Sequence, residues 1–409
     1  MITGLLALIL WFATAAPEDL AWPQWGGPDR NFSVSARALA ESWPADGPKR
    51  LWQRPLGDGL SGIVTDGATL YTMYRDGAND VVVALDAASG KTKWEARYEA
   101  PFNETCSFRL GAVPRAAPLI AGDRVVTVSA GGLMNSFDRA TGQQQWKVDL
   151  LERHSNASRA CGYSASPVAF EDLLITTAGG AGRGVVGVKT ATGEIAWRSQ
   201  DFQNGYSSPV LVDVGGRKEV IVFTYGEIAG LHPRTGALDW MRPHPADQGV
   251  NVATPLWGAD NLLFVSSAYN GGSRVLRLKR TADSIEPEEV WANKRVRIHF
   301  GNAVRLGRYV YTSNGDFGAA PFAAVDVTTG DMLWRDRGVG RSTVIAAGDK
   351  LIILSEDGQL VLATPTEQGL TVHARAAVLK ETAWTVPTLS GTKLYLRDRE
   401  QIMAVELGK

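Results

Sequence analysis

Residues able to bind or react are scattered through this chain as single polar and aromatic positions. The sequence contains no Gly-x-Ser-x-Gly elbow, no His-Glu-x-x-His pair, no phosphate-binding loop and no Cys-x-x-Cys. The best candidates instead offer guanidinium, imidazole, phenol, carboxamide, carboxylate and indole groups, which suit hydrogen bonding and stacking on a ligand or a peptide. These candidates are Arg115, Tyr163, Tyr206, Asn251, Tyr269, His299, Arg341, Glu356, Trp384 and Arg397.

Metal and thiol chemistry have little support in the sequence. The chain has five histidines, and none has the spacing of a metal site. We therefore predict no metal ligand and no catalytic residue. The chain has two cysteines, Cys106 and Cys161, which either form one disulfide bond between neighbouring loops or remain two partly buried thiols. Both interpretations stay open at the level of sequence.

A repeat defines the elements that must position these residues. The segment from Leu85 to Trp94 contains an apolar residue, Asp86, turn residues, a glycine, three spacers and a tryptophan. The aspartate caps a tight turn, the glycine takes a positive φ, and a strand resumes toward the tryptophan, which we expect to pack between sheets. Five copies are marked by Gly90 and Trp94, Gly142 and Trp146, Gly193 and Trp197, Gly236 and Trp240, and Gly330 and Trp334.

The spacing of the repeats predicts an all-β, eight-bladed β-propeller with four-stranded antiparallel blades. Successive tryptophans from Trp52 to Trp334 are 42 to 52 residues apart, enough for four short strands. The last repeat, Val386 to Leu407, has three strands and no tryptophan strand, whereas Arg50 to Gln53 resembles a fourth strand without a blade. We predict that this N-terminal strand pairs with the C-terminal blade and closes the ring. Three repeats depart from the pattern, so seven blades is the alternative count.

The candidate residues precede inner strands or lie between second and third strands. In a propeller these loops meet at the mouth of the central channel, where ligands usually bind. For each candidate the alternative is a structural role, such as capping a loop or closing a blade interface.

The N-terminal region has two expected parts. Gly4 to Phe12 is apolar and is followed by Ala13-Thr14-Ala15, which predicts a signal peptide over residues 1–15, with an uncleaved anchor as the alternative. Residues 16–49 are expected to form an extension packed on the propeller, which spans 50–409. The signal predicts a periplasmic or secreted protein that does not span the membrane once the signal is removed.

Composition excludes some partner classes. The 409 residues are 44% apolar and 21% charged, with a formal net charge of −1. This balance gives no electrostatic basis for binding nucleic acid or an anionic membrane.

The repeat resembles that of exported bacterial PQQ-like (pyrroloquinoline-quinone-type) β-propeller proteins, whose blades close with apolar-Asp-x-x-Thr-Gly-x-x-x-Trp. The resemblance covers almost everything from Arg50 to Leu407 and extends to Trp22 to Pro28 and to Lys393 to Asp398. It implies one of two branches: quinoprotein dehydrogenases, which bind the quinone and calcium in the funnel, or BamB-like scaffolds, which use the propeller without a cofactor.

The sequence favours the scaffold branch. A dehydrogenase of this type is expected to have a vicinal Cys-Cys pair, a calcium shell and an aspartate base, and the two cysteines here are far apart. We therefore expect a non-catalytic propeller that binds an envelope protein or peptide, with no cofactor. The alternatives are a PQQ-dependent alcohol or sugar dehydrogenase that binds PQQ with calcium, and small-metabolite or saccharide sensing through the central funnel.

Overall fold

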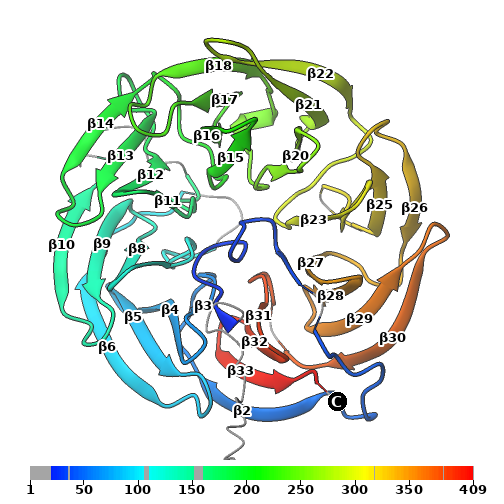
Figure 1. Ribbon diagram of the computed structural model, residues 1–409. Helices are drawn as coiled ribbons and strands as arrows, with labels where there is room; N and C mark the ends of the chain where they lie inside the picture. The colour runs from blue at the N-terminus through cyan, green and yellow to red at the C-terminus, as the bar shows by residue number, and fades with distance from the viewer. Residues whose placement is uncertain are drawn as a thin grey trace, which may run out of the picture.

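The chain forms a ring of antiparallel sheets around a central channel (Figure 1). The computed structural model describes residues 20–408 except 36, 106–109, 152–159, 317 and 381, so the expected signal peptide at 1–15 lies outside the described residues. Within the described residues there are eight sheets, each with four antiparallel strands, and one of them gains a fifth strand. The predicted eight-bladed propeller is confirmed.

The first four blades each run from the channel outward in chain order. Their strands are β3 (Val64–Thr65), β4 (Thr69–Asp76), β5 (Asn79–Asp86) and β6 (Thr92–Glu99); β7 (Leu119–Ala121), β8 (Arg124–Val128), β9 (Leu133–Asp138) and β10 (Gln144–Asp149); β11 (Val168–Phe170), β12 (Leu173–Thr177), β13 (Val185–Lys189) and β14 (Ile195–Ser199); and β15 (Val210–Val214), β16 (Arg217–Phe223), β17 (Glu227–Leu231) and β18 (Leu238–Pro243).

The next three blades repeat this order, and a short 3-10 helix, Asp247–Gly249, precedes the fifth. Their strands are β19 (Leu256–Trp257), β20 (Leu262–Ser267), β21 (Gly272–Arg280) and β22 (Ile285–Asn293); β23 (Ala303–Leu306), β24 (Tyr309–Ser313), β25 (Phe322–Asp326) and β26 (Met332–Asp336); and β27 (Ser342–Ala347), β28 (Lys350–Ser355), β29 (Gln359–Pro365) and β30 (Leu370–Ala377).

The eighth blade joins the two ends of the ring. Its inner strands are β31 (Thr388–Ser390), β32 (Lys393–Arg397) and β33 (Gln401–Glu406), and its outer strand is β2 (Lys49–Pro55). Strand β2 runs antiparallel to β33, with Trp52 opposite Ala404 and Pro55 opposite Gln401. The predicted closure by an N-terminal strand is therefore confirmed. Figure 1 shows blue β2 beside red β33.

Neighbouring blades are held together by apolar cores and by a repeated tryptophan contact. Trp94 of the first blade lies against Gly142 of the second, where φ is +75° and a Cβ atom would lie 2.5 Å from the indole. The indole Nε1 of Trp94 also donates to the Arg139 carbonyl at 3.0 Å. The same donor contact to the next blade is made by Trp52 to Ala87, Trp146 to Thr190, Trp291 to Val327 and Trp334 to Thr366.

The tryptophan contact between blades changes where the sequence departs from the repeat pattern. The fifth blade lacks the Thr-Gly turn, and Trp240 of the fourth blade donates instead to Oε2 of Glu219 in its own blade, at 3.0 Å. Glu219 is fully buried, and its Oε1 has no hydrogen-bond partner. Burial raises the pKa of Glu219 to about 8.

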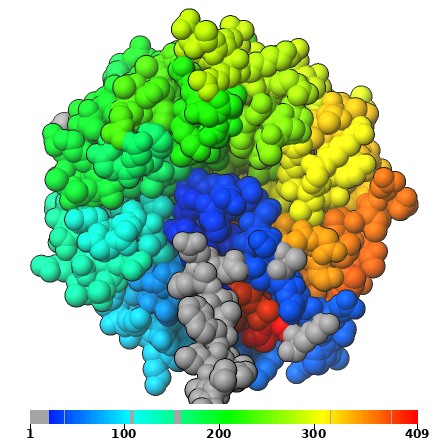
Figure 2. Space-filling model, viewed as in Figure 1, coloured from blue at the N-terminus to red at the C-terminus, as the bar shows by residue number. Residues whose placement is uncertain are grey.

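The N-terminal extension covers one end of the channel. Its strand β1 (Ser33–Val34) pairs in parallel with β27, and Trp22 bridges to Thr65 at the end of β3. Arg30 is buried and donates to the carbonyls of Ser166 and Pro167 at 2.9 Å each. Figure 2 shows the dark-blue extension filling the centre of this face. No helix among the described residues is long and apolar enough to cross a membrane.

The glycine in the repeat gives a direct test of the tryptophan contact. We expect Gly142→Ala to lower the free energy of unfolding by about 3 kcal/mol, about 1 from the positive φ and about 2 from overpacking against Trp94. Gly122 is the matched control, because its φ is +63° and a Cβ there would meet nothing within 4 Å. Urea unfolding followed by tryptophan fluorescence measures both variants. Equal losses would contradict the contact.

The buried carboxyl of Glu219 predicts a pH dependence of stability. Its folded pKa lies above its ordinary value, so the protonated form stabilises the folded protein fully below about pH 4.5. This contribution is lost as the pH rises toward 8, by up to about 1.4 kcal/mol per pH unit. Glu219→Gln should flatten the pH dependence of the unfolding free energy across this range, whereas Glu286→Gln, on an exposed position of β22, should leave it unchanged.

Candidate functional site

A cavity of about 140 Å³ lies in the central channel, at the end where the innermost strands begin. Every residue lining it except Trp25 precedes an innermost strand, so the cavity belongs to the channel mouth. Trp25 comes from the extension and closes the channel side of the cavity, and its Nε1 donates to Oγ1 of Thr254 at 2.9 Å. The lining is Trp25, Leu60, Leu110, Arg115, Cys161, Ser164, Tyr206, Ser208, Val250, Val252, Thr254, Phe300, Gly301, Asn302 and Trp384.

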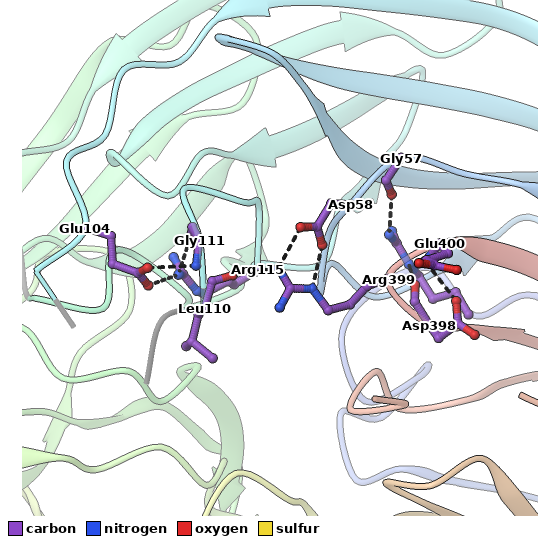
Figure 3. Close-up of polar contacts among 10 residues, drawn as sticks. Gly57, Asp58, Glu104, Leu110, Gly111, Arg115, Asp398, Arg399 and Glu400 are labelled. Atoms are coloured by element: carbon purple, nitrogen blue, oxygen red, sulfur yellow. Dashed lines mark hydrogen bonds and ion pairs between the residues drawn. The ribbon is translucent and has the colours of Figure 1, made fainter. Parts of the chain in front are cut away.

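Arg115 is the charged residue in this lining. Its side chain is 7% exposed, and Nη2 donates to Oε1 of Glu104 at 3.0 Å and to the Gly111 carbonyl at 2.7 Å (Figure 3). Nε and Nη1 are buried without a hydrogen-bond partner. Gly162 makes room for the guanidinium, because a Cβ there would lie 2.6 Å from Nη1. Burial lowers the pKa of Arg115 from its ordinary value.

A second ion pair lies beside Arg115. Arg399 donates to both carboxylate oxygens of Asp58, at 2.7 and 2.6 Å, and to the Leu110 carbonyl at 3.0 Å. Figure 3 shows Asp58 facing Arg399, with Glu104 and Gly111 on the other side of Leu110. These pairs connect the first, second and eighth blades at the mouth.

Five of the predicted candidates form one connected network on the other side of the mouth. Tyr269 contacts His299 through its hydroxyl, and Arg341 donates to Nδ1 of His299 at 2.5 Å. Glu356 forms an ion pair with Nε of Arg341 at 3.4 Å and accepts from Nε1 of Trp384 at 3.2 Å. The network therefore spans the fifth to the eighth blades, and Trp384 brings it to the cavity.

The network fixes the protonation of His299. A guanidinium only donates, so Nδ1 of His299 accepts and Nε2 carries the hydrogen that it donates to the hydroxyl of Tyr269. Burial, together with the charge of Arg341, lowers the pKa of His299 to about 4, which keeps the ring neutral. Burial also raises the pKa of Tyr269. Neither ring is therefore suited to carry charge near neutral pH.

The loop that carries Tyr269 is conformationally strained. Tyr269 and Asn270 have φ values of +53° and +64°, which bulky residues rarely adopt. The Tyr269 amide donates to Oδ1 of Asp316 at 3.1 Å, and Asn270 donates to Oδ2 of Asp247 at 2.6 Å. Such strain persists where surrounding contacts hold it, and it is common at binding sites.

Other sequence-predicted candidates support the mouth without lining the cavity. Tyr163 is buried, and its hydroxyl contacts Thr176 and the Thr177 carbonyl. Asn251 is buried and donates to neighbouring carbonyls. Arg397 is fully buried in β32 and donates to carbonyls of the first blade. Arg115, Tyr206 and Trp384 do line the cavity.

The sequence analysis did not select two of the aromatic lining residues. Trp25 lies in the aromatic, turn-rich stretch from Trp22 to Pro28, outside the repeat, which was the available signal. Phe300 follows His299 directly and stacks on it with ring centroids 3.7 Å apart. Phe300 also contacts Trp384, with centroids 5.2 Å apart. These aromatic rings make the cavity mostly apolar.

The cysteine and metal predictions have different outcomes. Cys161 lines the cavity and is disulfide-bonded. Cys106, the other cysteine of the chain, lies outside the described residues, so the Cys106–Cys161 pairing stays a prediction. Across the described part of the chain, no group of three or more His, Cys, Asp and Glu residues is arranged to hold a metal ion.

Comparison with known proteins points to two groups of propellers. The sequence model of the family described as outer membrane protein assembly factor BamB matches residues 37–200 and 157–336. BamB of Burkholderia pseudomallei is 26% identical over 353 residues, which cover 81% of this chain and 80% of that protein.

The sequence similarity to a dehydrogenase covers less of both chains than the similarity to BamB does. A quinohemoprotein alcohol dehydrogenase of Pseudomonas putida is 31% identical over 182 residues, 44% of this chain and 24% of that protein, so the chain spans about a quarter of that relative. The crystal structure of a quinohemoprotein alcohol dehydrogenase from Comamonas testosteroni superposes with a TM-score of 0.69 at 14% identity, covering 97% of this chain and 82% of that one. At this identity the superposition shows the fold alone.

Arg397 provides a test of how the mouth is held at the ring closure. Nη1 donates to the Met73 carbonyl at 2.6 Å and to Thr72 Oγ1 at 3.0 Å, and Nη2 donates to the Gly57 carbonyl at 3.3 Å. Arg397→Met leaves these buried acceptors unmatched and should lower the free energy of unfolding by about 3 kcal/mol.

The control for this variant is Arg375→Met. Arg375 is exposed and donates across a blade boundary to the Gly338 carbonyl at 2.8 Å. Its replacement should change the unfolding free energy by less than about 0.5 kcal/mol. Urea denaturation compares the two variants. A loss for Arg397→Met no larger than for the control would show that the hydrogen bonds of Arg397 to the first blade do not stabilise the ring closure.

Proposed function

Because the chain belongs to the family of outer membrane protein assembly factor BamB, we propose that it is a non-catalytic binding scaffold of the bacterial cell envelope. Its partner is a protein or peptide that contacts the channel mouth. The observation that carries the proposal is the extent of the BamB match, 353 residues and about four fifths of both chains, whereas the dehydrogenase match covers 24% of that enzyme.

The chemistry of the mouth supports the same proposal. The network from Tyr269 to Trp384 presents rigid aromatic and polar groups whose positions are fixed by neighbouring blades. Tyrosine, tryptophan and arginine are enriched where proteins bind one another, because they bury a large area and still form hydrogen bonds. The extension covers the other face of the ring, which leaves the mouth as the proposed binding face.

The described residues do not fit calcium and pyrroloquinoline quinone. That cofactor is a fused tricyclic tricarboxylate, whereas Arg115 is the cation in the cavity lining and is already paired with Glu104. No described group of acidic, histidine or cysteine residues is arranged for a metal ion. We therefore derive no quinone-dependent step for this chain. Export to the periplasm or beyond, by the signal predicted at residues 1–15, is part of the proposal.

Site-specific cross-linking tests the scaffold function. A photoreactive amino acid replaces Asn270, an exposed residue in a loop at the mouth, or Asp283, an exposed residue in a turn at the opposite end of the sheets. Cross-linking is carried out in intact envelopes, and the products are identified by mass spectrometry. We expect the same envelope protein to be captured repeatedly from position 270 and not from position 283. Capture only from position 283 would contradict the proposed binding face.

A separate assay addresses the dehydrogenase alternative. The purified protein is incubated with pyrroloquinoline quinone and calcium, and dye-linked oxidation of a panel of alcohols and sugars is followed. We expect no turnover above that of free cofactor. Cofactor-dependent turnover that is abolished by heat denaturation would overturn the proposal that the propeller is non-catalytic.

A further inference from the structure

A band of exposed cations runs along the outer rim of the fifth, sixth and seventh blades. It is carried by the outer strands β26 and β30 and by the loops that follow β22 and β26 (Figure 1). These loops lie on the mouth face, because each leads from an outer strand to the next innermost strand. The cationic band consists of Lys294, Arg295, Arg335, Arg337 and Arg375, and all five side chains are exposed.

Contacts between blades join these residues into one surface. Arg295 and Arg335 line the same open pocket, whose volume is about 480 Å³. Arg375 of the seventh blade donates to the carbonyl of Gly338, in the loop after β26, at 2.8 Å. The band also reaches the mouth, because the Arg295 carbonyl accepts from Asn314, in the loop between β24 and β25, at 3.3 Å. The cationic band is therefore continuous with the proposed binding face.

The charge of the band is not neutralised within the described part of the chain. Arg297 and Arg341, which lie in the same two loops, form ion pairs with Asp316 and Glu356. By contrast, none of the five cations of the band forms an ion pair with another described residue. The rim therefore carries a local positive charge, although the formal net charge of the whole chain is −1.

The pocket shared by Arg295 and Arg335 has both charged and apolar walls. Its lining also includes Met332 and Trp334, which are partly exposed, and Asp331. The indole nitrogen of Trp334 donates to a carbonyl of the seventh blade at 2.8 Å, and Nε of Arg335 contacts the sulfur of Met332, so these walls are held in place. Within the described residues, the Nη atoms of Arg335 and the side chain of Arg295 have no hydrogen-bond partner. These exposed donors can therefore bind an acceptor from solution.

The chemistry of the band favours a short acidic protein segment over other anionic partners. Guanidinium groups bind carboxylates through paired hydrogen bonds, and the methionine and tryptophan surface between them accepts an apolar side chain. A nucleic acid or an anionic bilayer presents its charge over a wide area. Carboxylates elsewhere on the mouth face, such as the exposed Asp247, would oppose such a surface.

We propose that the cationic band binds an acidic segment of a protein partner, in which carboxylates alternate with apolar side chains. The carboxylates pair with Arg295 and Arg335, and an apolar side chain packs on Trp334 and Met332. This inference rests on the proposed scaffold function and deepens it, because it names the chemistry of the partner segment at the rim of the binding face.

Peptide binding to the purified protein tests the charge of this segment. The probe is a fluorescein-labelled peptide in which glutamates alternate with leucines, and its binding is followed by fluorescence anisotropy. We expect saturable binding that weakens as sodium chloride is added, because salt screens exposed ion pairs. A peptide with glutamine in place of glutamate should bind at least about tenfold more weakly. Equal binding of the two peptides, or no binding of the glutamate peptide, would overturn the proposal.

A double variant with a matched control locates the site. Arg295→Gln combined with Arg335→Gln should weaken binding of the glutamate peptide about tenfold. The control combines Lys147→Gln with Lys91→Gln, which removes the same charge from the first two blades. Lys147 is exposed and follows Trp146 in β10 as Arg335 follows its tryptophan in β26.

The control should change the affinity by less than about twofold. Circular dichroism checks that both double variants are folded, and the exposed positions of all four residues make loss of the fold unexpected. Equal weakening by the two double variants would show attraction by overall charge alone and would overturn the assignment of the site.

Competition decides the class of partner. A single-stranded oligonucleotide and phosphatidylglycerol vesicles compete with the labelled peptide, and we expect both to compete more weakly than the unlabelled glutamate peptide. Stronger competition by either would overturn the choice of a protein segment. Partner capture from position 270 is scored separately. Capture without peptide binding rejects only the acidic segment, whereas peptide binding without capture rejects the scaffold function and supports the cationic band as a site for acidic peptides.

Discussion

Circular closure is the constraint on which the rest of this structure depends. Most blades cover the tryptophan of the preceding blade, so an open ring would leave two sheet faces, one indole and two strand edges exposed to water. The pairing of β2 with β33 removes both edges, and Trp52 then packs on Gly90 of the first blade as Trp94, Trp146, Trp197 and Trp291 pack on the repeat glycine of the next blade. Arg397 crosses the same boundary with its buried guanidinium.

Closure also explains why the mouth is a coherent site. Once the ring is complete, loops that are hundreds of residues apart converge on one axis, so that Leu60 and Trp384 line the same cavity. Contacts between blades then fix the loops: the chain of contacts from Tyr269 to Trp384 crosses three blade boundaries. A rigid ring can hold a strained residue such as Tyr269, because its neighbours restrict the alternatives.

The extension has two roles that follow from its position. It covers one end of the channel through strand pairing with β27 and through the buried Arg30, and it supplies Trp25 to the cavity from within the channel. The mouth is therefore built partly by residues outside the repeat. This addition distinguishes the cavity of this chain from what the blades alone would form.

The sequence by itself determined the blade and the closing strand and favoured eight blades over seven, because turn chemistry and the Gly and Trp positions are local and repeat at a nearly fixed period. The structure decided the count of eight. It also indicated which loops reach the mouth. Only the tertiary structure decided which side chains face the cavity and that Trp25 closes it. It also decided that Arg397 joins the eighth blade to the first and that Trp240 donates to Glu219. These outcomes depend on how non-repeating loops pack against distant blades, and no local pattern encodes that packing.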